Sequence, residues 1–251
     1  MDREKVERLQ EMVNDAKRIV FFGGAGVSTE SGIPDFRSVD GLYHQKYDYP
    51  PETILSHTFF MRNTDEFYKF YYDKILLDEA QPNAAHKKLA EMEAAGKLTA
   101  VVTQNIDGLH QKAGSKNVLE LHGSVLRNYC RDCGAFYTGE DMLDFKAKWK
   151  AGEAGVTPRC PKCGGLIKPD VVLYEEGLDQ RTIEESVDHI SKADLLIIGG
   201  TSLVVYPAAG LIDYFRGDHL VLINKSATAR DSSADLVITD PIGEVLSQIN
   251  V

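Results

Sequence analysis

The four cysteines constrain the fold of this chain more than any other feature. They form two C-x-x-C pairs separated by 26 residues, and no thiol is left over. Each pair can place two thiolates on one tight turn, and two such turns supply the four sulfur ligands that Zn²⁺ takes in closed structural sites. We therefore predict one structural zinc ion, bound by Cys130, Cys133, Cys160 and Cys163.

Two disulfides or redox-active pairs are the alternatives to zinc. No segment approaches the roughly 18 uninterrupted apolar residues of a membrane helix, and the start of the chain, MDREKVERLQ, is too charged for a signal peptide. These features predict a cytoplasmic protein. Disulfides are rare in that compartment, and a thioredoxin-type site needs only one pair. Because four sulfurs leave no open position for water, we expect the zinc to stabilise the fold and the catalytic groups to lie elsewhere.

Short apolar runs alternate with helical patterns along most of the 251 residues. Apolar residues recur at three- and four-residue steps over residues 3–17, which predicts a helix. Uninterrupted apolar runs, typical of buried parallel strands, lie at 18–22, 98–103, 195–198, 220–223 and 236–238. This alternation predicts an α/β fold with a Rossmann-like, mostly parallel sheet and helices on both faces.

Two segments break this alternation. Residues 39–80 hold ten aromatic residues and predict helices with a small core of their own. Residues 128–168 contain the cysteine pairs and little regular apolar period, which predicts a ribbon stabilised by its metal. We expect a Rossmann-like domain of residues 1–38, 81–127 and 169–251. The smaller domain would combine a helical part, 39–80, with a zinc-ribbon part, 128–168.

Two glycine-rich loops follow predicted strands. In the first, Gly24–Thr29, the glycines let a pyrophosphate approach the backbone, although Thr29 stands where a dinucleotide loop usually has its third glycine. The second, Gly199–Ser202, precedes a helix expected from Pro207, and Asn224 follows where a polar side chain can contact the adenosine ribose. Either loop alone is also typical of an ordinary strand-loop-helix turn. Two of them on one sheet favour nucleotide binding.

Polar residues gather in two further places beyond predicted strands. The first is the run Thr103–His110, and the second is the run Leu119–Gly123, which contains His122. Ligand sites in open α/β sheets lie beyond the carboxyl ends of the strands, so both runs are placed for binding or catalysis. The other histidines have no such neighbours, and we expect them to be structural or to lie on the surface: His44, His57, His86, His189 and His219.

In chain order, these motifs resemble the sirtuin family of NAD-dependent protein deacylases. The resemblance rests on the run GAGVSTESGIPDFR at 24–37, on Thr103–His110, on His122 with Gly123, on the cysteine pairs and on GTSLVVYP at 200–207. It extends over nearly the whole chain. It implies that NAD is consumed as a co-substrate, that nicotinamide is released, and that the acyl group of a substrate lysine is transferred to give O-acyl-ADP-ribose.

The resemblance also implies roles for individual residues. We expect His122 to act as general base on a ribose hydroxyl after the acyl oxygen has attacked C1′, and Asn105 to be the second catalytic residue. Asp107 is expected to accept a hydrogen bond from the nicotinamide carboxamide. The residues expected to contact NAD are Ala25, Gly26, Thr29, Asp35, Phe36, Arg37, Gln104, Asn105, Ile106, Asp107, His122, Gly200, Thr201, Ser202, Asn224 and Ile242.

By the same resemblance, the substrate peptide adds as a strand in the cleft between the two domains. The residues expected to contact it are Val172, Tyr174, Val204 and Val205. The chain departs from the family pattern here, because Tyr174-Glu175-Glu176 stands where the family usually has Phe-Gly-Glu. Two carboxylates beside the cleft suggest a preference for substrates with flanking Lys or Arg.

The choice of acyl group follows from a second departure. Sirtuins that prefer succinyl or malonyl lysine share a Tyr-x-x-Arg pair, and the matching residues here are Tyr68 and Tyr71. Without the arginine, a buried acidic acyl group lacks a charge partner, so we expect an acetyl or longer aliphatic acyl group.

The remaining expectations concern partners and competing functions. The net charge of −10 argues against a duplex nucleic-acid partner, and no membrane partner is expected. We expect a monomer that acts on acyl-lysine proteins. The alternatives are NAD-dependent mono-ADP-ribosyl transfer to protein and a non-enzymatic zinc-ribbon binding module. The polar cluster of Asn105, Asp107 and His122 argues against the module.

Overall fold

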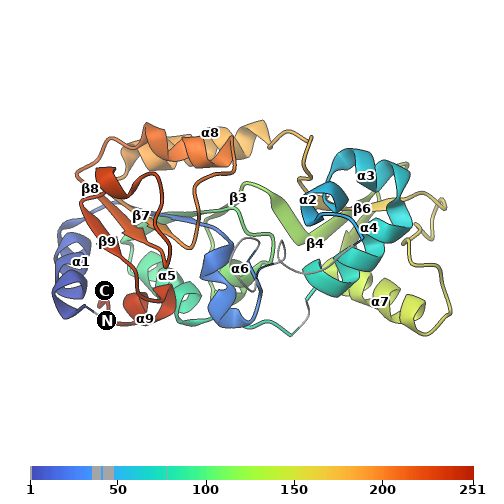
Figure 1. Ribbon diagram of the computed structural model, residues 1–251, viewed down its shortest axis with the longest axis horizontal. Helices are drawn as coiled ribbons and strands as arrows, with labels where there is room; N and C mark the ends of the chain where they lie inside the picture. The colour runs from blue at the N-terminus through green and yellow to red at the C-terminus, as the bar shows by residue number, and fades with distance from the viewer. Residues whose placement is uncertain (1, 36–40, 42–47, 78) are drawn as a thin grey trace.

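The computed structural model describes residues 2–35, 41, 48–77 and 79–251. These residues form a larger part, which holds both chain termini at one end of the molecule, and a smaller part at the opposite end (Figure 1). None of the helices in the described residues combines the length and the apolar character that crossing a bilayer requires.

A six-stranded parallel sheet forms the centre of the larger part. Its strands are β1 (Ile19–Gly23), β2 (Leu98–Thr103), β3 (Val118–Glu120), β7 (Leu195–Gly199), β8 (His219–Ile223) and β9 (Leu236–Ile238), in the order β3-β2-β1-β7-β8-β9. From β1 the chain builds outward through β2 to β3, and it later returns to the other side of β1 with β7. The order therefore reverses between β1 and β7, where doubly wound sheets bind their ligands. The predicted fold class is confirmed.

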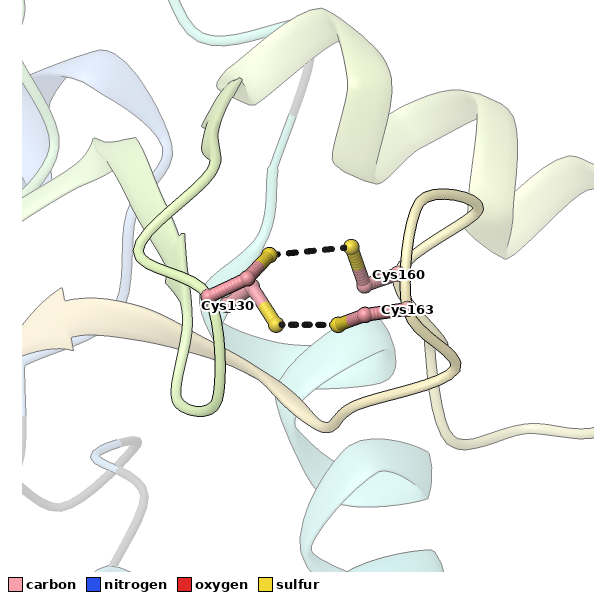
Figure 2. A group of neighbouring side chains, drawn as sticks. Cys130, Cys160 and Cys163 are labelled. Carbon is pink, nitrogen blue, oxygen red and sulfur yellow. Dashed lines mark hydrogen bonds between the residues drawn. The ribbon is translucent and has the colours of Figure 1, made fainter.

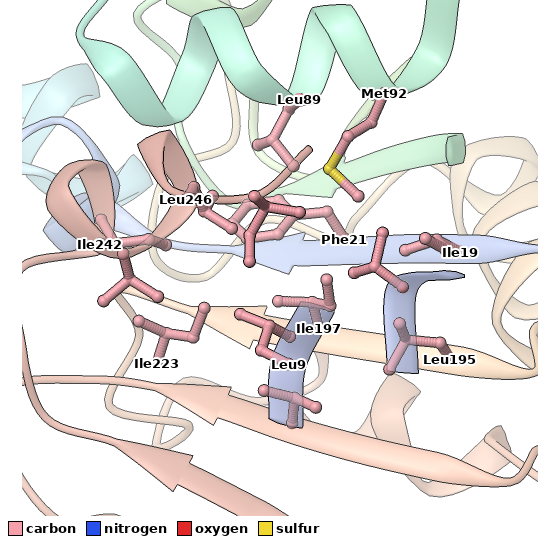
Figure 3. Packing of buried hydrophobic residues seen from close by; sticks show 14 of the residues in the cluster. Leu9, Ile19, Phe21, Leu89, Met92, Leu195, Ile197, Ile223, Ile242 and Leu246 are labelled. Carbon is pink, nitrogen blue, oxygen red and sulfur yellow. The ribbon is translucent and has the colours of Figure 1, made fainter. Parts of the chain in front are cut away.

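Helices cover both faces of this sheet because side chains alternate along each strand. Ile19 and Phe21 of β1 pack with α1 (Arg3–Asp15), α5 (Ala84–Ala94) and α9 (Ile242–Ser247), as Figure 3 shows. Val20 and Phe22 pack on the other face with α8 (Gln180–Lys192) and the 3-10 turn Ala208–Tyr214. Every residue of β1 and β7 is buried, which explains their uninterrupted apolar sequences.

Two helix predictions are wrong in detail. The first helix ends at Asp15 and not at residue 17, because the Asp194 carboxylate accepts the backbone N–H groups of Lys17 and Arg18, each at 3.0 Å. These bonds hold the chain extended as it enters β1. The helix expected from Pro207 is instead the 3-10 turn, in which Gly210 removes one helix-stabilising side chain.

The smaller part combines short helices with an antiparallel sheet. The helices are α2 (Pro51–Ile54), α3 (His57–Arg62) and α4 (Thr64–Phe70), followed by a π turn at Tyr71–Ile75. The sheet order is β5-β4-β6, with β4 (Gly123–Cys130), β5 (Phe136–Thr138) and β6 (Ile167–Val171). The aromatic side chains of 59–72 pack against this sheet in one core, and the Tyr68 hydroxyl donates to the carbonyl of Ile167. β4 and β6 continue across the predicted domain limits at 128 and 168, so the strands themselves join the two parts.

The segment 128–168 contains more regular structure than the predicted ribbon. Helix α7 spans Gly139–Lys150 and begins with a capping box between Thr138 and Asp141. Its apolar residues Met142, Phe145 and Trp149 follow a helical period and pack on the aromatic core. This three-residue pattern is too short to stand out beside the cysteines, so the prediction missed the helix. The short helix α6 (Leu109–Ala113) packs on α5 in the larger part.

Candidate active site

The two glycine-rich loops lie against each other at the carboxyl ends of β1 and β7. Gly26 donates its N–H to the carbonyl of Gly200 at 2.8 Å, and a Cβ on Gly26 would lie only 2.8 Å from the Gly200 Cα. Gly200 has φ +60°, and a Cβ there would overlap the backbone nitrogen of Val27. Only glycines permit this approach. The resulting backbone surface carries no side chains at these glycines, so the pyrophosphate of a dinucleotide can approach it closely.

Asn224 hydrogen-bonds to the backbone of the second glycine-rich loop. Its side-chain Oδ1 accepts the Thr201 N–H at 3.0 Å, and its Nδ2 donates to the Thr201 carbonyl at 2.9 Å. Gln104, beyond β2, donates from Nε2 to the Thr201 hydroxyl at 3.0 Å. Thr201 is therefore fixed from two strands, and much of the hydrogen-bonding capacity of Asn224 is used on the protein itself.

A buried chain of side-chain hydrogen bonds joins the first loop to the segment after β2. Asn105 donates from Nδ2 to the Ser28 hydroxyl at 3.1 Å, and that hydroxyl donates to Asp107 Oδ2 at 2.7 Å. The other Asp107 oxygen accepts the N–H of Leu109 at 2.9 Å. Ser28 and Asn105 are only 1% and 7% exposed, so water does not compete for these bonds. The arrangement makes a rigid polar wall at the reversal point of the sheet.

His122 stands at the edge of this wall, between the two parts of the molecule. Its Nδ1 lies 3.0 Å from the carbonyl of Gln104, so Nδ1 carries the proton and Nε2 of the neutral ring can accept one. Its own carbonyl accepts the N–H of Val172 at 2.9 Å. Burial lowers the pKa of His122, and the bond to Gln104 opposes that effect in part. The ring is therefore neutral, and able to act as a base, at neutral pH.

Exposed apolar side chains follow β6 and β7. Tyr174, which follows β6, is 41% exposed, while Val204 and Tyr206, beyond β7, are 56% and 67% exposed. Val172 is half-buried, and Val205 accepts a helical hydrogen bond from Ala209. Exposed apolar groups on two segments are typical of a surface that binds a partner chain.

The four cysteines lie together at the far end of β4 and form a separate site. Their sulfur atoms all lie within 4.8 Å of one another, and a tetrahedral site with Zn–S bonds of about 2.3 Å places sulfurs about 3.8 Å apart. Figure 2 shows the thiols facing one another between two loops. Gly134 and Gly164 close these loops with φ of +69° and +77°, as the predicted tight turns require. The hydroxyl of Tyr137 lies 3.0 Å from the sulfur of Cys160 and lowers the pKa of that thiol to about 6. The donor set fits Zn²⁺, and Cys130 and Cys160 belong to the aromatic core, so the metal would stabilise the smaller part.

The other residues predicted to contact NAD differ in their surroundings. Ala25 and Gly26 belong to a 3-10 turn, and the Thr29 hydroxyl donates to the carbonyl of Gly26. Ile106 and Ile242 are largely covered by the protein, and Ile242 begins α9 beneath Gly199. Ser202 is exposed beside Thr201. Asp35 ends the first described segment, while Phe36 and Arg37 lie outside the described residues.

His110 lies in the core and not in the site. It is 1% exposed, its ring centre is 4.7 Å from that of His86, and neither of its nitrogens has a hydrogen-bond partner among the described residues. The expectation that His86 is structural agrees with its complete burial.

The comparisons with known proteins decide the family. The model of the Sir2 family matches residues 24–207, which include both glycine loops, His122 and the cysteine pairs. The chain belongs to the Sir2 family. A protein of Clostridium acetobutylicum named "NAD-dependent protein deacetylase" is 59% identical over 248 residues, 98% of each chain. A protein of the same name from Staphylococcus aureus is 43% identical over 98% of each chain.

Solved Sir2 structures share the fold closely. One, described as "Structural Basis for the Mechanism and Regulation of Sir2 Enzymes", has a TM-score of 0.86 and 42% identity over 98% of this chain and 96% of its own. Another, described as "Sir2-p53 peptide-NAD+", has a TM-score of 0.84 and 40% identity over 97% of this chain and 96% of its own.

The structure gives two further residues of this Sir2 chain a place at the site that the sequence did not indicate. Ser28 connects Asn105 to Asp107, and its place within the first glycine-rich loop was the one available signal. Asn83 caps α5 by accepting the N–H of Ala85 at 2.9 Å, and its Nδ2 donates to the Val27 carbonyl at 2.8 Å and to the Ser31 hydroxyl at 3.0 Å. Asn83 thus fastens the first loop to α5 over a sequence separation that no local pattern reveals.

Proposed function

We propose that this Sir2-family chain removes acetyl or other uncharged acyl groups from protein lysines, with NAD as the consumed co-substrate and nicotinamide and O-acyl-ADP-ribose as products. Its relatives named as NAD-dependent protein deacetylases match it along almost its whole length. A Sir2 structure at 39% identity is described with a deacetylated p53 peptide and 3′-O-acetyl-ADP-ribose.

The observation that carries this proposal is the single polar network at the reversal point of the sheet. It joins the loops after β1, β2 and β7 through Ser28, Asn105, Gln104 and Thr201, and His122 hydrogen-bonds to the same segment. A dinucleotide in this crevice would meet the side-chain-free backbone of the glycine loops at one end and a neutral base at the other. This combination suits cleavage and transfer chemistry on a nucleotide better than a passive binding module.

The chemistry of each group of residues suits a different role in the proposed reaction. When bound, NAD supplies a ribosyl group whose bond to nicotinamide can be exchanged for a bond to the acyl oxygen of the substrate. The glycine loops would bind its phosphates, and the network of Ser28, Asn105 and Asp107 would hold the nicotinamide end and exclude water. His122 would accept a proton at Nε2 from a ribose hydroxyl, because Nδ1 is committed to Gln104.

The acyl-lysine would enter between the exposed segments around Tyr174 and Val204. We propose that the peptide pairs there as an added strand, since Tyr174, Val204 and Tyr206 offer apolar surface on both sides. Tyr71, which stands in place of the arginine of desuccinylases, is 1% exposed, and its hydroxyl has no hydrogen-bond partner among the described residues. It offers no positive charge for an acidic acyl group.

The cytoplasm is the proposed compartment, because four reduced cysteines arranged for a metal suit a reducing environment. A monomer is the proposed form, and the elution volume on a calibrated size-exclusion column tests it.

Product analysis tests the proposed reaction. The protein is incubated with NAD and an acetyl-lysine peptide, and the mixture is followed by mass spectrometry. We expect deacetylated peptide and O-acetyl-ADP-ribose to appear in equal amounts and only when NAD is present. ADP-ribosylated peptide or protein in place of these products would establish the transferase alternative, and an absence of NAD consumption would contradict both.

A further inference from the structure

The segment 172–176, on which the proposed peptide site depends, is attached to the helical part of the molecule by its backbone. Tyr174 donates its N–H to the carbonyl of Leu55 at 3.0 Å, and its carbonyl accepts the N–H of His57 at 2.9 Å. Ser56 and Tyr174 thereby form a parallel bridge at the start of α3. These backbone bonds hold the segment 172–176 against the start of α3.

Glu175 has a backbone conformation that is unusual for its residue type. Its φ is +75°, in the left-handed region where a side chain with a Cβ is disfavoured and glycine is the common choice. Glycine is also what the family pattern has at this position. A glutamate that accepts this conformation needs a compensating interaction.

The carboxylate of Glu175 supplies that interaction on the side of the helix. Its Oε2 accepts the backbone N–H of Thr58 at 2.8 Å, in the first turn of α3, where N–H groups lack intrahelical partners. The Ser56 hydroxyl takes the next free donor, the N–H of Phe59, at 3.2 Å. The hydrogen bond to Thr58 lowers the pKa of Glu175, so the carboxylate is charged at neutral pH. The side chain thus bonds to α3.

Glu176 is also engaged within the protein. Its two oxygens accept from the His57 ring at 2.8 Å, from the N–H of Leu173 at 2.9 Å and from the Lys168 ammonium at 3.1 Å. Lys168 in turn donates to the carbonyl of Val171 at 2.9 Å. The Lys168 ammonium and the His57 ring face Glu176 directly, so this carboxylate is already paired.

We infer that Glu175 is a positioning residue, which fixes the segment 172–176 to α3, and that it does not serve as a docking group for basic residues of the substrate. This inference rests on the proposed deacylase function and deepens it. It also replaces the preference for Lys or Arg flanks that the sequence suggested, because both carboxylates are bonded to the protein.

Two substitutions separate positioning from charge. Glu175→Gln keeps an oxygen that can accept the Thr58 N–H but removes the charge, while Glu175→Ala removes both. The assay measures kcat and KM for acetyl-lysine peptides with either Lys and Arg or Asp and Glu beside the acetyl-lysine, at saturating NAD. We expect Glu175→Ala to raise the peptide KM about two- to tenfold, the factor that corresponds to one net hydrogen bond, with the KM for NAD unchanged. Glu175→Gln should keep a peptide KM close to that of the wild type for both kinds of flank.

A matched control removes the other cap of the same helix. Ser56→Ala loses the bond to Phe59 and should lower the melting temperature as Glu175→Ala does, but leave the peptide KM unchanged. The inference is overturned if Glu175→Gln selectively weakens peptides with basic flanks, or if Glu175→Ala and Ser56→Ala have the same peptide KM. A wild-type protein without NAD-dependent deacylation would instead refute the proposed function, so the two failures are distinguishable.

Discussion

Replacing His110 with leucine should make the stability of the protein less sensitive to acid. His110 is buried between β1 and α5, with Phe21 at 6.2 Å and His86 at 4.7 Å between ring centres. Burial, together with a smaller effect of the neighbouring His86, lowers its pKa to about 3. Leucine has a similar volume and no ionisable group, so the substitution removes the titration while preserving most of the packing.

The size of the effect follows from proton linkage. An unfolded histidine has a pKa near 6.5, so below that pH the unfolded state binds a proton that the folded state excludes. The free energy of unfolding therefore falls as the pH falls from about 7, and it continues to fall until the folded pKa is reached. Between pH 8 and pH 5.5 the contribution of His110 amounts to about 1.4 kcal/mol.

Urea unfolding, followed by circular dichroism at pH 8 and at pH 5.5, measures this contribution. The wild type should lose about 1.4 kcal/mol more than His110→Leu between the two pH values, whatever the absolute stability of the variant at pH 8. Comparing losses cancels packing changes and the titration of other groups. An equal loss in both proteins would show that the folded state accommodates a protonated His110, and the account of its burial would be wrong.

Three further predictions concern the site and the metal. Gly123→Ala should abolish most activity and destabilise the protein, because Gly123 has φ +77° next to His122 and a Cβ would overlap the Asp170 carbonyl oxygen. Steady-state kinetics measure the activity and thermal melting measures the stability. Near-normal activity would contradict the geometry. Cys163→Ser should lower the zinc content measured by elemental analysis, and it should inactivate the enzyme because the smaller part loses its structure. A zinc-free sample that keeps its fold and its activity would exclude a structural metal. Deacetylation should be faster than desuccinylation of otherwise identical peptides, since Tyr71 carries no charge; the reverse order would overturn that assignment.

The parts of the molecule that local sequence patterns control were predictable. Fully buried strands such as β1 and β7 have uninterrupted apolar sequences, and the cysteine pairs with their glycines specify tight turns. The glycine loops and His122 follow strands directly, so their meeting at one edge of the sheet follows from the parallel arrangement.

The remaining features depend on contacts between residues far apart in the chain. Asp194 ends α1 early by binding backbone groups of Lys17 and Arg18, and Asn83 reaches Val27 across 56 positions. The sequence suggested that Glu175 faces the substrate, but only its backbone conformation and the position of Thr58 show where its carboxylate lies. Helix α7 was hidden because its few apolar residues lie within a segment dominated by cysteines and polar residues.

The central claim is that His122 acts as the base beside the NAD crevice, and the kinetics of His122→Ala test it most directly. The variant should keep the melting temperature and the zinc content of the wild type. Its kcat for deacetylation should fall by about 10²- to 10⁴-fold, the range for loss of a general base. If a folded, zinc-containing His122→Ala protein retains deacetylation within a few-fold of the wild type, the assignment of His122, and with it this account of the site, is wrong.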